Sequence, residues 1–159
     1  MSNVTKAKSF TKHFALARTV SKNPTIVWKE VVTAAVEKGM ALIITNGKVS
    51  EAISTSGQLF GIAGADGAVG DVIPVYAGDR NNVFVGQVDN ADISAVTYPM
   101  ECDLVEVSND HRVDIGSSVE DVFLVLGPET SDTLDDTDAG ARVYFQIKRS
   151  QYDDLVAAR

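Results

Sequence analysis

Residues 59–79 read LFGIAGADGAVGDVIPVYAGD, and this stretch decides the fold class. Two apolar runs, Leu59–Ala63 and Val72–Tyr76, flank a segment in which glycine recurs every three residues. Glycine adopts positive φ without steric cost, so it is suited to chain reversals. We therefore predict two strands joined by turns, and the expected turn residues are Gly61, Gly64, Gly67 and Gly70.

The strongest local signal lies just before this stretch. Met40–Thr45 is apolar, and Lys48–Ile53 alternates between apolar and polar residues. Between them, Asn46-Gly47 is the dipeptide typical of a two-residue type I′ turn. The pattern predicts a β-hairpin with Asn46 and Gly47 at its tip.

Short strand-like runs recur along the rest of the chain. Residues 26–36 are compatible with a helix or a strand; their β-branched residues favour a strand, in which Trp28 would be a packing residue. Further strands are expected at 83–88, 95–98, 101–107, 119–126 and 141–147, and one or two helical turns at 148–159. The pattern predicts a mainly all-β fold, a small barrel or sandwich with an extended N-terminal arm and room for one short helix.

Charge is distributed unevenly along the chain. The formal net charge is −8, yet residues 1–29 carry six basic side chains and no acid. Residues 30–159 carry the other eight bases and all 22 acids, which leaves −14. We therefore divide the chain into a basic arm, residues 1–25, and a β-rich body, residues 26–159. Such an arm either docks on a complementary surface or a neighbouring copy, or remains solvated.

No sequence pattern is typical of a catalytic or cofactor site. The glycines at 61–70 lack the G-x-G-x-x-G spacing of a dinucleotide fingerprint, and no Lys-Ser/Thr follows them as in a phosphate loop. The lone cysteine, Cys102, excludes a disulfide within the chain and is interpreted as a small, half-buried side chain. We predict that the chain is not an enzyme and has no cofactor.

Two groups of residues suggest metal binding. His111 has Asp110 and Asp114 nearby, but a structural metal site needs three or four converging ligands. We therefore interpret His111 as a solvated turn histidine, and His13 lies in the polar arm. The segment Glu129–Asp138 carries five acids but lacks the order of a calcium loop, so it is predicted to be a solvated surface loop. No metal site is expected.

The arm also has features of a nucleic-acid-binding segment, because lysines and phenylalanines are interleaved in residues 6–14. The strongly acidic body would repel phosphates, so a protein partner is preferred and no nucleic acid is expected. No run reaches the roughly 18 apolar residues that a membrane span needs, so no membrane partner is expected.

Residues 36–79, VEKGMALIITNGKVSEAISTSGQLFGIAGADGAVGDVIPVYAGD, resemble the small β-domain of tailed-phage head decoration proteins, also called capsid cement proteins. In that family a glycine turn enters a strand, an N-G-K-V hairpin follows, and strands with FGIA and G-D-V-I-P-V come next. The resemblance covers less than a third of the chain. The long basic arm and the residues after about Val88 depart from the family pattern.

The resemblance implies a bacteriophage virion protein, made in the host cytoplasm and bound to the outer surface of an icosahedral head. It implies a homo-oligomer, commonly a trimer, that clamps neighbouring major capsid subunits, with the arm laid across the lattice. The residues expected to contact the capsid are Lys6, Lys8, Phe10, Lys12, Phe14 and Arg18, with the two phenylalanines as anchors. The alternatives are a tail-tube or head-completion protein and a carbohydrate-binding host-attachment domain.

Overall fold

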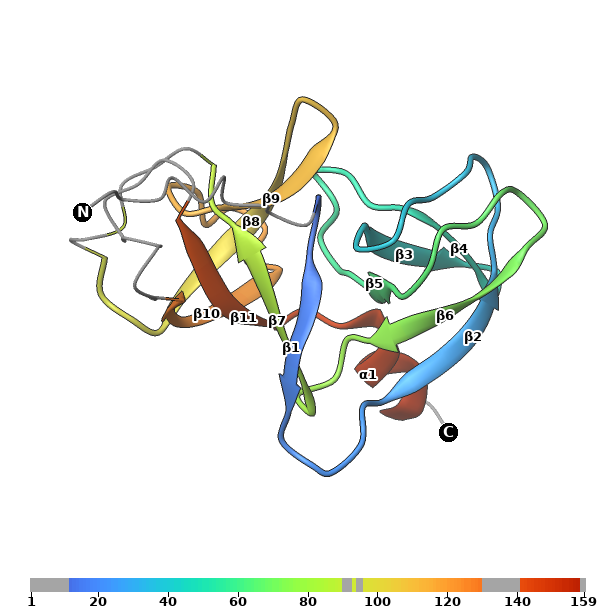
Figure 1. Ribbon diagram of the computed structural model, residues 1–159, viewed down its shortest axis with the longest axis horizontal. Coiled ribbons are helices and arrows are strands. Elements are labelled where there is room, and N and C mark those ends of the chain that lie inside the picture. Colours follow the sequence, from blue (N-terminus) through green and yellow to red (C-terminus); the bar gives the residue numbers. More distant parts are fainter. Residues whose placement is uncertain (1–11, 90–92, 94–95, 130–140, 158–159) are drawn as a thin grey trace, which may run out of the picture.

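The structure, a computed structural model, describes residues 12–89, 93, 96–129 and 141–157. Over these residues the chain is built almost entirely of strands, and the all-β prediction is confirmed (Figure 1). The elements are β1 (Ala15–Thr19), β2 (Ile26–Glu30), β3 (Ala41–Thr45), β4 (Lys48–Glu51), β5 (Gly61–Ala63), β6 (Val72–Ala77), β7 (Asn82–Gln87), β8 (Met100–Val107), β9 (Asp110–Asp114), β10 (Phe123–Glu129), β11 (Arg142–Ile147) and the helix α1 (Gln151–Ala157).

The strands form two antiparallel sheets that lie side by side (Figure 1). One sheet has the strand order β1-β7-β11-β10-β8-β9, and the other has the order β2-β6-β5-β3-β4. An isolated bridge joins Val88 to Val113, on β9 of the first sheet, and another joins Val31 to Val49, on β4 of the second. The result agrees with the predicted small barrel or sandwich.

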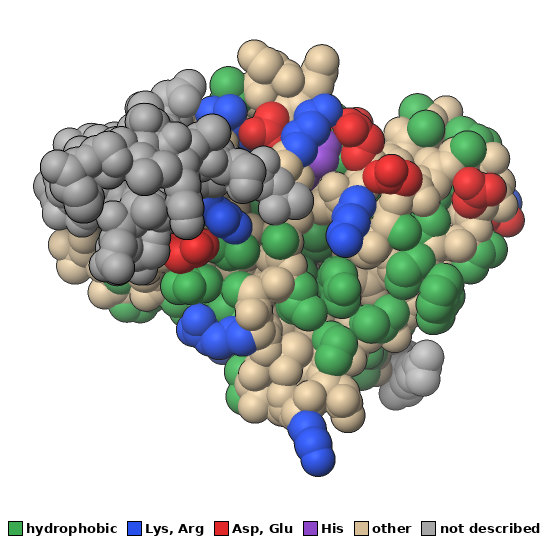
Figure 2. Space-filling view, viewed as in Figure 1, with side chains coloured by type: hydrophobic (Ala, Val, Ile, Leu, Met, Phe, Trp, Pro, Cys, Tyr) green, Lys and Arg blue, Asp and Glu red, His purple; other side chains and the backbone are tan. Residues whose placement is uncertain are grey.

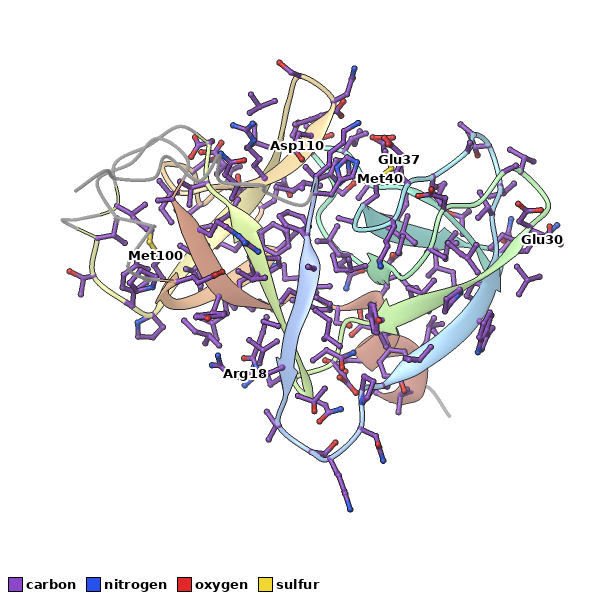
Figure 3. All side chains as sticks on the ribbon, viewed as in Figure 1. Arg18, Glu30, Glu37, Met40, Met100 and Asp110 are labelled. Atoms are coloured by element: carbon purple, nitrogen blue, oxygen red, sulfur yellow. The ribbon has the colours of Figure 1, made fainter. Side chains whose placement is uncertain are left out.

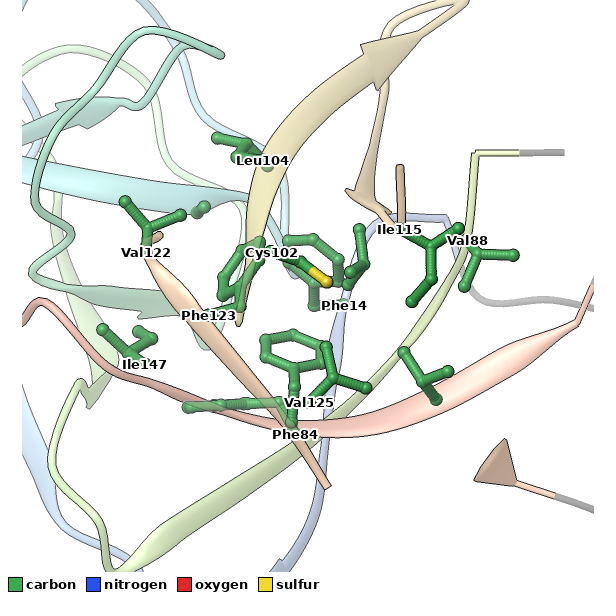
Figure 4. Packing of buried hydrophobic residues seen from close by; sticks show 14 of the residues in the cluster. Phe14, Phe84, Val88, Cys102, Leu104, Ile115, Val122, Phe123, Val125 and Ile147 are labelled. Carbon is green, nitrogen blue, oxygen red and sulfur yellow. The ribbon is translucent and has the colours of Figure 1, made fainter. Parts of the chain in front are cut away.

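Each sheet encloses a hydrophobic cluster. The larger one contains a group of phenylalanine rings, among them Phe14, Phe84 and Phe123 (Figure 4). The centroid of the Phe145 ring lies 4.9 Å from that of Phe14 and 4.6 Å from that of Phe123. A smaller cluster lies inside the five-stranded sheet. β5 is buried along its whole length because Ile62 belongs to the larger cluster and Ala63 to the smaller. This explains the unbroken apolar run in the sequence.

The β3–β4 hairpin is confirmed. Leu42–Thr45 of β3 pairs with Lys48–Glu51 of β4, and both tip residues have positive φ, 52° for Asn46 and 78° for Gly47. These values belong to the type I′ turn that the dipeptide predicts.

The glycine prediction is confirmed only for Gly70, which lies in a turn with a φ of 94°. Gly64 lies at a bend, Gly67 lies in an isolated bridge and Gly61 lies inside β5. A Cβ on Gly61 would collide with the carbonyl oxygen of Tyr76. The turn assignment is therefore wrong for Gly61 and Gly67, where the missing side chain allows neighbouring strands to approach closely.

Several predicted strands are shifted. In the 26–36 run the strand ends at Glu30, and residues 96–98 form no strand. β10 begins at Phe123 instead of residue 119, because the backbone N–H groups of Val119 and Asp121 turn toward the carboxylate of Asp103. The short helix predicted in residues 148–159 is confirmed as α1.

The predicted boundary between arm and body also changes. β1 pairs with β7 at the edge of the six-stranded sheet, in the register Ala15 to Val85 and Leu16 to Phe84. Residues 12–25 are therefore part of the folded body. The remaining arm residues, 1–11, lie outside the described part of the chain.

A buried asparagine joins the two connections between the sheets. The amide nitrogen of Asn82 donates to the carbonyl oxygens of Thr25 and Ala77, each at 2.9 Å. Its amide oxygen accepts the Thr25 N–H at 3.1 Å. Asn82 thus fixes the β1–β2 connection against the β6–β7 connection.

Candidate functional site: a buried histidine pair at the root of β1

His13 and Phe14, just before β1, are held by polar contacts between the two sheets. We call this place the root of β1, and the polar contacts of His13 and His111 there the joint. The backbone N–H of His13 donates to Asp110 Oδ1 at 2.5 Å, and the N–H of Phe14 donates to the carbonyl oxygen of Gly39 at 3.0 Å. His13 itself has a φ of 66°. Figure 3 shows Asp110 and Glu37 close to the upper end of β1.

His111, on β9, is 1% exposed and uses both ring nitrogens. Nδ1 accepts the backbone N–H of Ala41 at 3.0 Å, and Nε2 lies 3.1 Å from Glu51 Oε1. An acceptor at Nδ1 places the single proton of the neutral ring on Nε2, where it donates to the carboxylate. The ring therefore connects β9 to β3 and β4.

His13, which is 3% exposed, repeats this arrangement. Its Nδ1 accepts the backbone N–H of His111 at 2.9 Å, and its Nε2 lies 3.4 Å from Glu37 Oε1. The two imidazole rings meet edge to face, with 5.1 Å between their centroids. Lys12 Nζ also binds Glu37, at 3.0 Å.

The pKa values of two groups at the joint are shifted, each for a clear physical reason. Burial lowers the pKa of His111, and the carboxylate of Glu51 acts in the opposite direction. Hydrogen bonds from Lys12 and then His13 lower the pKa of the exposed Glu37 carboxyl. The structure thus favours a neutral His111 and an ionised Glu37.

The prediction that His111 is a solvated turn histidine is wrong, and His13 is buried as well. Their partners are far away in the sequence: 97 residues separate His13 from Asp110, and 70 separate His111 from Ala41. A histidine in a polar segment carries no local signal for such contacts. The fold brings the two rings together by placing β9 beside the start of β1.

One cluster of side chains at the joint has ligand atoms close enough together to be examined as a metal site. The ligand atoms of Glu51, Glu106 and His111 lie within 4.8 Å of one another. A metal on Nε2 would need the ring proton on Nδ1, which instead accepts the Ala41 N–H. The donor set therefore fits hydrogen bonding better than metal coordination. Asp110, from the combination suggested by the sequence, is bound to His13 and Arg112 instead.

The residues predicted to contact a capsid are dispersed. Lys6, Lys8 and Phe10 lie outside the described residues. Phe14 is 1% exposed, so its predicted role as a surface anchor is wrong: its ring packs inside the chain's own core. Lys12, which precedes β1, is exposed and binds Glu37. Arg18 is exposed near the other end of β1 (Figure 3). Its guanidinium lies 4.9 Å from the centroid of the Tyr144 ring.

Two other candidates give no site in the described residues. Cys102 is fully buried, beyond the half-burial predicted, and burial followed by the charge of Asp103 raises its pKa to about 12. Its thiol therefore stays protonated and unreactive at neutral pH. In the acidic segment, Asp132, Asp135, Asp136 and Asp138 lie outside the described residues.

An exposed apolar face lies on the outer side of β2 and β6. Ile26 is 40% exposed, Val72 59% and Trp28 64%, and Trp28 lies opposite Pro74 in the register. Figure 2 shows hydrophobic side chains gathered on the side of the molecule that carries β2 and β6. We call Ile26, Trp28, Val72 and Pro74 the Trp28 face. The expectation that Trp28 is a packing residue is wrong, because most of its side chain is exposed to solvent.

The strand that carries Trp28 also has an open edge. Thr25 and Val31 bond to the β6 side through Ala77 and Asp71, so the alternation of an antiparallel strand directs the N–H and C=O of Trp28 away from β6. Among the described residues β4 hydrogen-bonds this segment at Val32, beyond the end of β2, and Lys48 on β4 forms an ion pair with Glu30 at 2.6 Å. A cleft of about 630 Å³, lined in part by Lys29, Ile44 and Leu155, lies beside this edge.

Comparison with known proteins assigns no family. No model of a protein family matches the chain, and no curated protein matches it. The described helix is too short and too polar to cross a membrane. Inference about function therefore rests on the sequence and geometry given above.

Proposed function

We propose that the chain is a virion structural protein that decorates the outer surface of an icosahedral phage head and stabilises contacts between major capsid subunits. The observation that carries this proposal is the resemblance of residues 36–79 to head decoration proteins. These residues contribute β3 to β6, four of the strands of the five-stranded sheet. The resemblance therefore extends over one continuous structural unit.

The Trp28 face supports this proposal and adds a contact that the sequence did not suggest. A large exposed apolar patch on a small protein is typical of an interaction surface. β2 also exposes backbone N–H and C=O groups at its edge, which an extended segment of a capsid subunit can pair with by adding a strand. The proposed contacts of the body are therefore Ile26, Trp28 and Val72.

The basic residues supply a second group of contacts. Lys12 and the joint around His13 fix the start of the described chain to the body, and Lys6 and Lys8 precede Lys12 in the sequence. Contacts of modest strength on each copy become strong when several copies bind one symmetric lattice. A trimer that binds the major capsid protein is the assembly we propose.

Co-sedimentation with empty mature capsids of the phage that encodes the chain tests the proposal. We expect saturable binding at a fixed ratio to the capsid subunit. Trp28→Ser should weaken it at least tenfold, whereas Val119→Ser, at a more exposed apolar residue outside the Trp28 face, should not. Deletion of residues 1–11 tests the arm, and it must stop before Lys12 because residues 12–25 belong to the body.

Other outcomes would contradict the proposal. Absence of binding to capsids, together with rings of the isolated protein, would indicate a tail-tube or head-completion protein. A second candidate, a carbohydrate-binding attachment domain, is favoured by the exposed Trp28 ring, since sugars bind to aromatic faces. Glycan-array binding that Trp28→Ser abolishes would support that candidate.

A further inference from the structure

We infer that His13 and His111 form an acid-sensitive latch that holds the start of β1 and the β8–β9 hairpin against the five-stranded sheet. The inference concerns the folded chain itself and does not depend on the proposed function. It rests on the geometry of one continuous series of hydrogen bonds through both imidazole rings.

The series crosses from one sheet to the other. Ala41, at the start of β3, donates its N–H to Nδ1 of His111 on β9. The N–H of His111 donates to Nδ1 of His13, and the N–H of His13 donates to Asp110 on β9. At two of these three steps the acceptor is an imidazole nitrogen, which accepts only while it carries no proton.

Protonation of either ring breaks the series. A proton on Nδ1 of His111 would face the N–H of Ala41, two donors about 3.0 Å apart. The buried N–H would then lose its acceptor, and the ring would have to turn or β9 move away from β3. A cationic ring at His13 would further repel one at His111, with only 5.1 Å between the centroids.

The charged groups around the rings come from every neighbouring element and are of both signs. Glu51 on β4 and Glu106 on β8 favour the cationic form of His111, whereas burial of the ring opposes it and is the largest contribution. The groups that face the pair are Lys12, Glu37, Glu51, Glu106, Asp110 and Arg112. The balance keeps His111 neutral at a pH where an unfolded histidine is already protonated.

The sign of the pH dependence follows. An unfolded histidine binds its proton at a pKa of about 6.5, and the pKa of His111 in the folded chain is lower. Below about pH 6.5 the unfolded state therefore binds more protons than the folded state. The contribution of the latch to stability is complete above that pH and decreases as the pH falls toward the folded-state pKa.

Two measurements on the full chain test the latch. The chain has only two histidines, so ¹⁵N NMR resolves both rings, and we expect the neutral form with the proton on Nε2 for each at pH 8. We also expect Tm to fall by about 3 °C or more between pH 7.5 and pH 5.5, a window in which carboxyl groups of ordinary pKa contribute little. A neutral ring with the proton on Nδ1 would overturn the inference.

Matched variants separate the latch from other acid effects. In the double variant His13→Asn, His111→Asn the amide oxygen can replace Nδ1 as an acceptor but does not titrate, so the fall in Tm between pH 7.5 and 5.5 should shrink by at least half. An undiminished fall would overturn the inference. If the double variant does not fold, Glu51→Gln keeps an acceptor for Nε2 but removes the charge, and the NMR titration of His111 should move to lower pH; an unmoved titration at or above pH 6.5 would also overturn it.

Discussion

The root of β1 and the Trp28 face differ in burial, and the difference is the opposite of what the residue types alone would predict. At the root, two buried histidines meet several carboxylates at the joint between the sheets. On the outer face of β2 and β6, the single tryptophan and two aliphatic side chains are exposed. Polar residues are therefore buried at the root of β1, and apolar residues are exposed on the Trp28 face.

The difference shows that burial follows the supply of partners. A histidine can be buried where backbone N–H groups point at Nδ1 and carboxylates face Nε2, because no polar atom is then left unpaired. A tryptophan stays exposed where no layer of the described fold packs over its sheet face. The first arrangement stabilises the chain, and the second leaves surface for a partner.

The largest effect is expected at Phe14, which follows His13 and supplies the apolar part of the same joint. Phe14→Ala should lower the free energy of unfolding by about 3–5 kcal/mol, because the ring packs among Phe123 and Phe145. Urea unfolding at pH 7.5 measures the loss, with Arg18→Ala as the exposed control on β1. A loss below about 1 kcal/mol would mean that this segment is a detachable arm, as the sequence had suggested.

The contact between Phe14 and Gly86 can be tested by a double-mutant cycle. A Cβ on Gly86 would collide with the Phe14 ring, so Gly86→Ala should cost about 1–3 kcal/mol. In the presence of Phe14→Leu, which removes the colliding ring atoms, the same change should cost much less. Strict additivity of the two changes would contradict this packing.

The next substitution tests Asn82, a buried polar residue that joins the connections between the sheets. Asn82→Ala should cost about 2–3 kcal/mol, because the peptide groups of Thr25 and Ala77 lose their partners. Asn82→Asp should cost more at pH 7.5, since a carboxylate would face two carbonyl oxygens. Asn81→Ala, at the partly exposed neighbouring position, is the control and should cost less; equal losses at the two positions would contradict the special role of Asn82.

The parts of the fold that the sequence predicts correctly are those with local causes. Asn46-Gly47 specifies its own turn, and alternation in residues 141–147 specifies β11. The predicted role of Gly61 failed because its reason is a contact with Tyr76 on the neighbouring strand. The histidine joint was missed for the same reason: its partners come from β3, β4 and β9, and no short window of sequence contains them.

The smallest effect on stability is expected at the Trp28 face, and it is the most informative about function. Trp28→Ser should change the free energy of unfolding by less than about 1 kcal/mol, because the ring buries little area and its main neighbour is Pro74 across the strand pair. The same position reports on partners, since Trp28 is the only tryptophan in the chain. Its fluorescence should resemble that of the unfolded chain in the dilute protein and shift to shorter wavelength when capsids are added. A shifted spectrum that reverts on dilution would instead assign the Trp28 face to contacts between copies of the chain, and a spectrum unchanged by capsids would remove this face from the proposed interface.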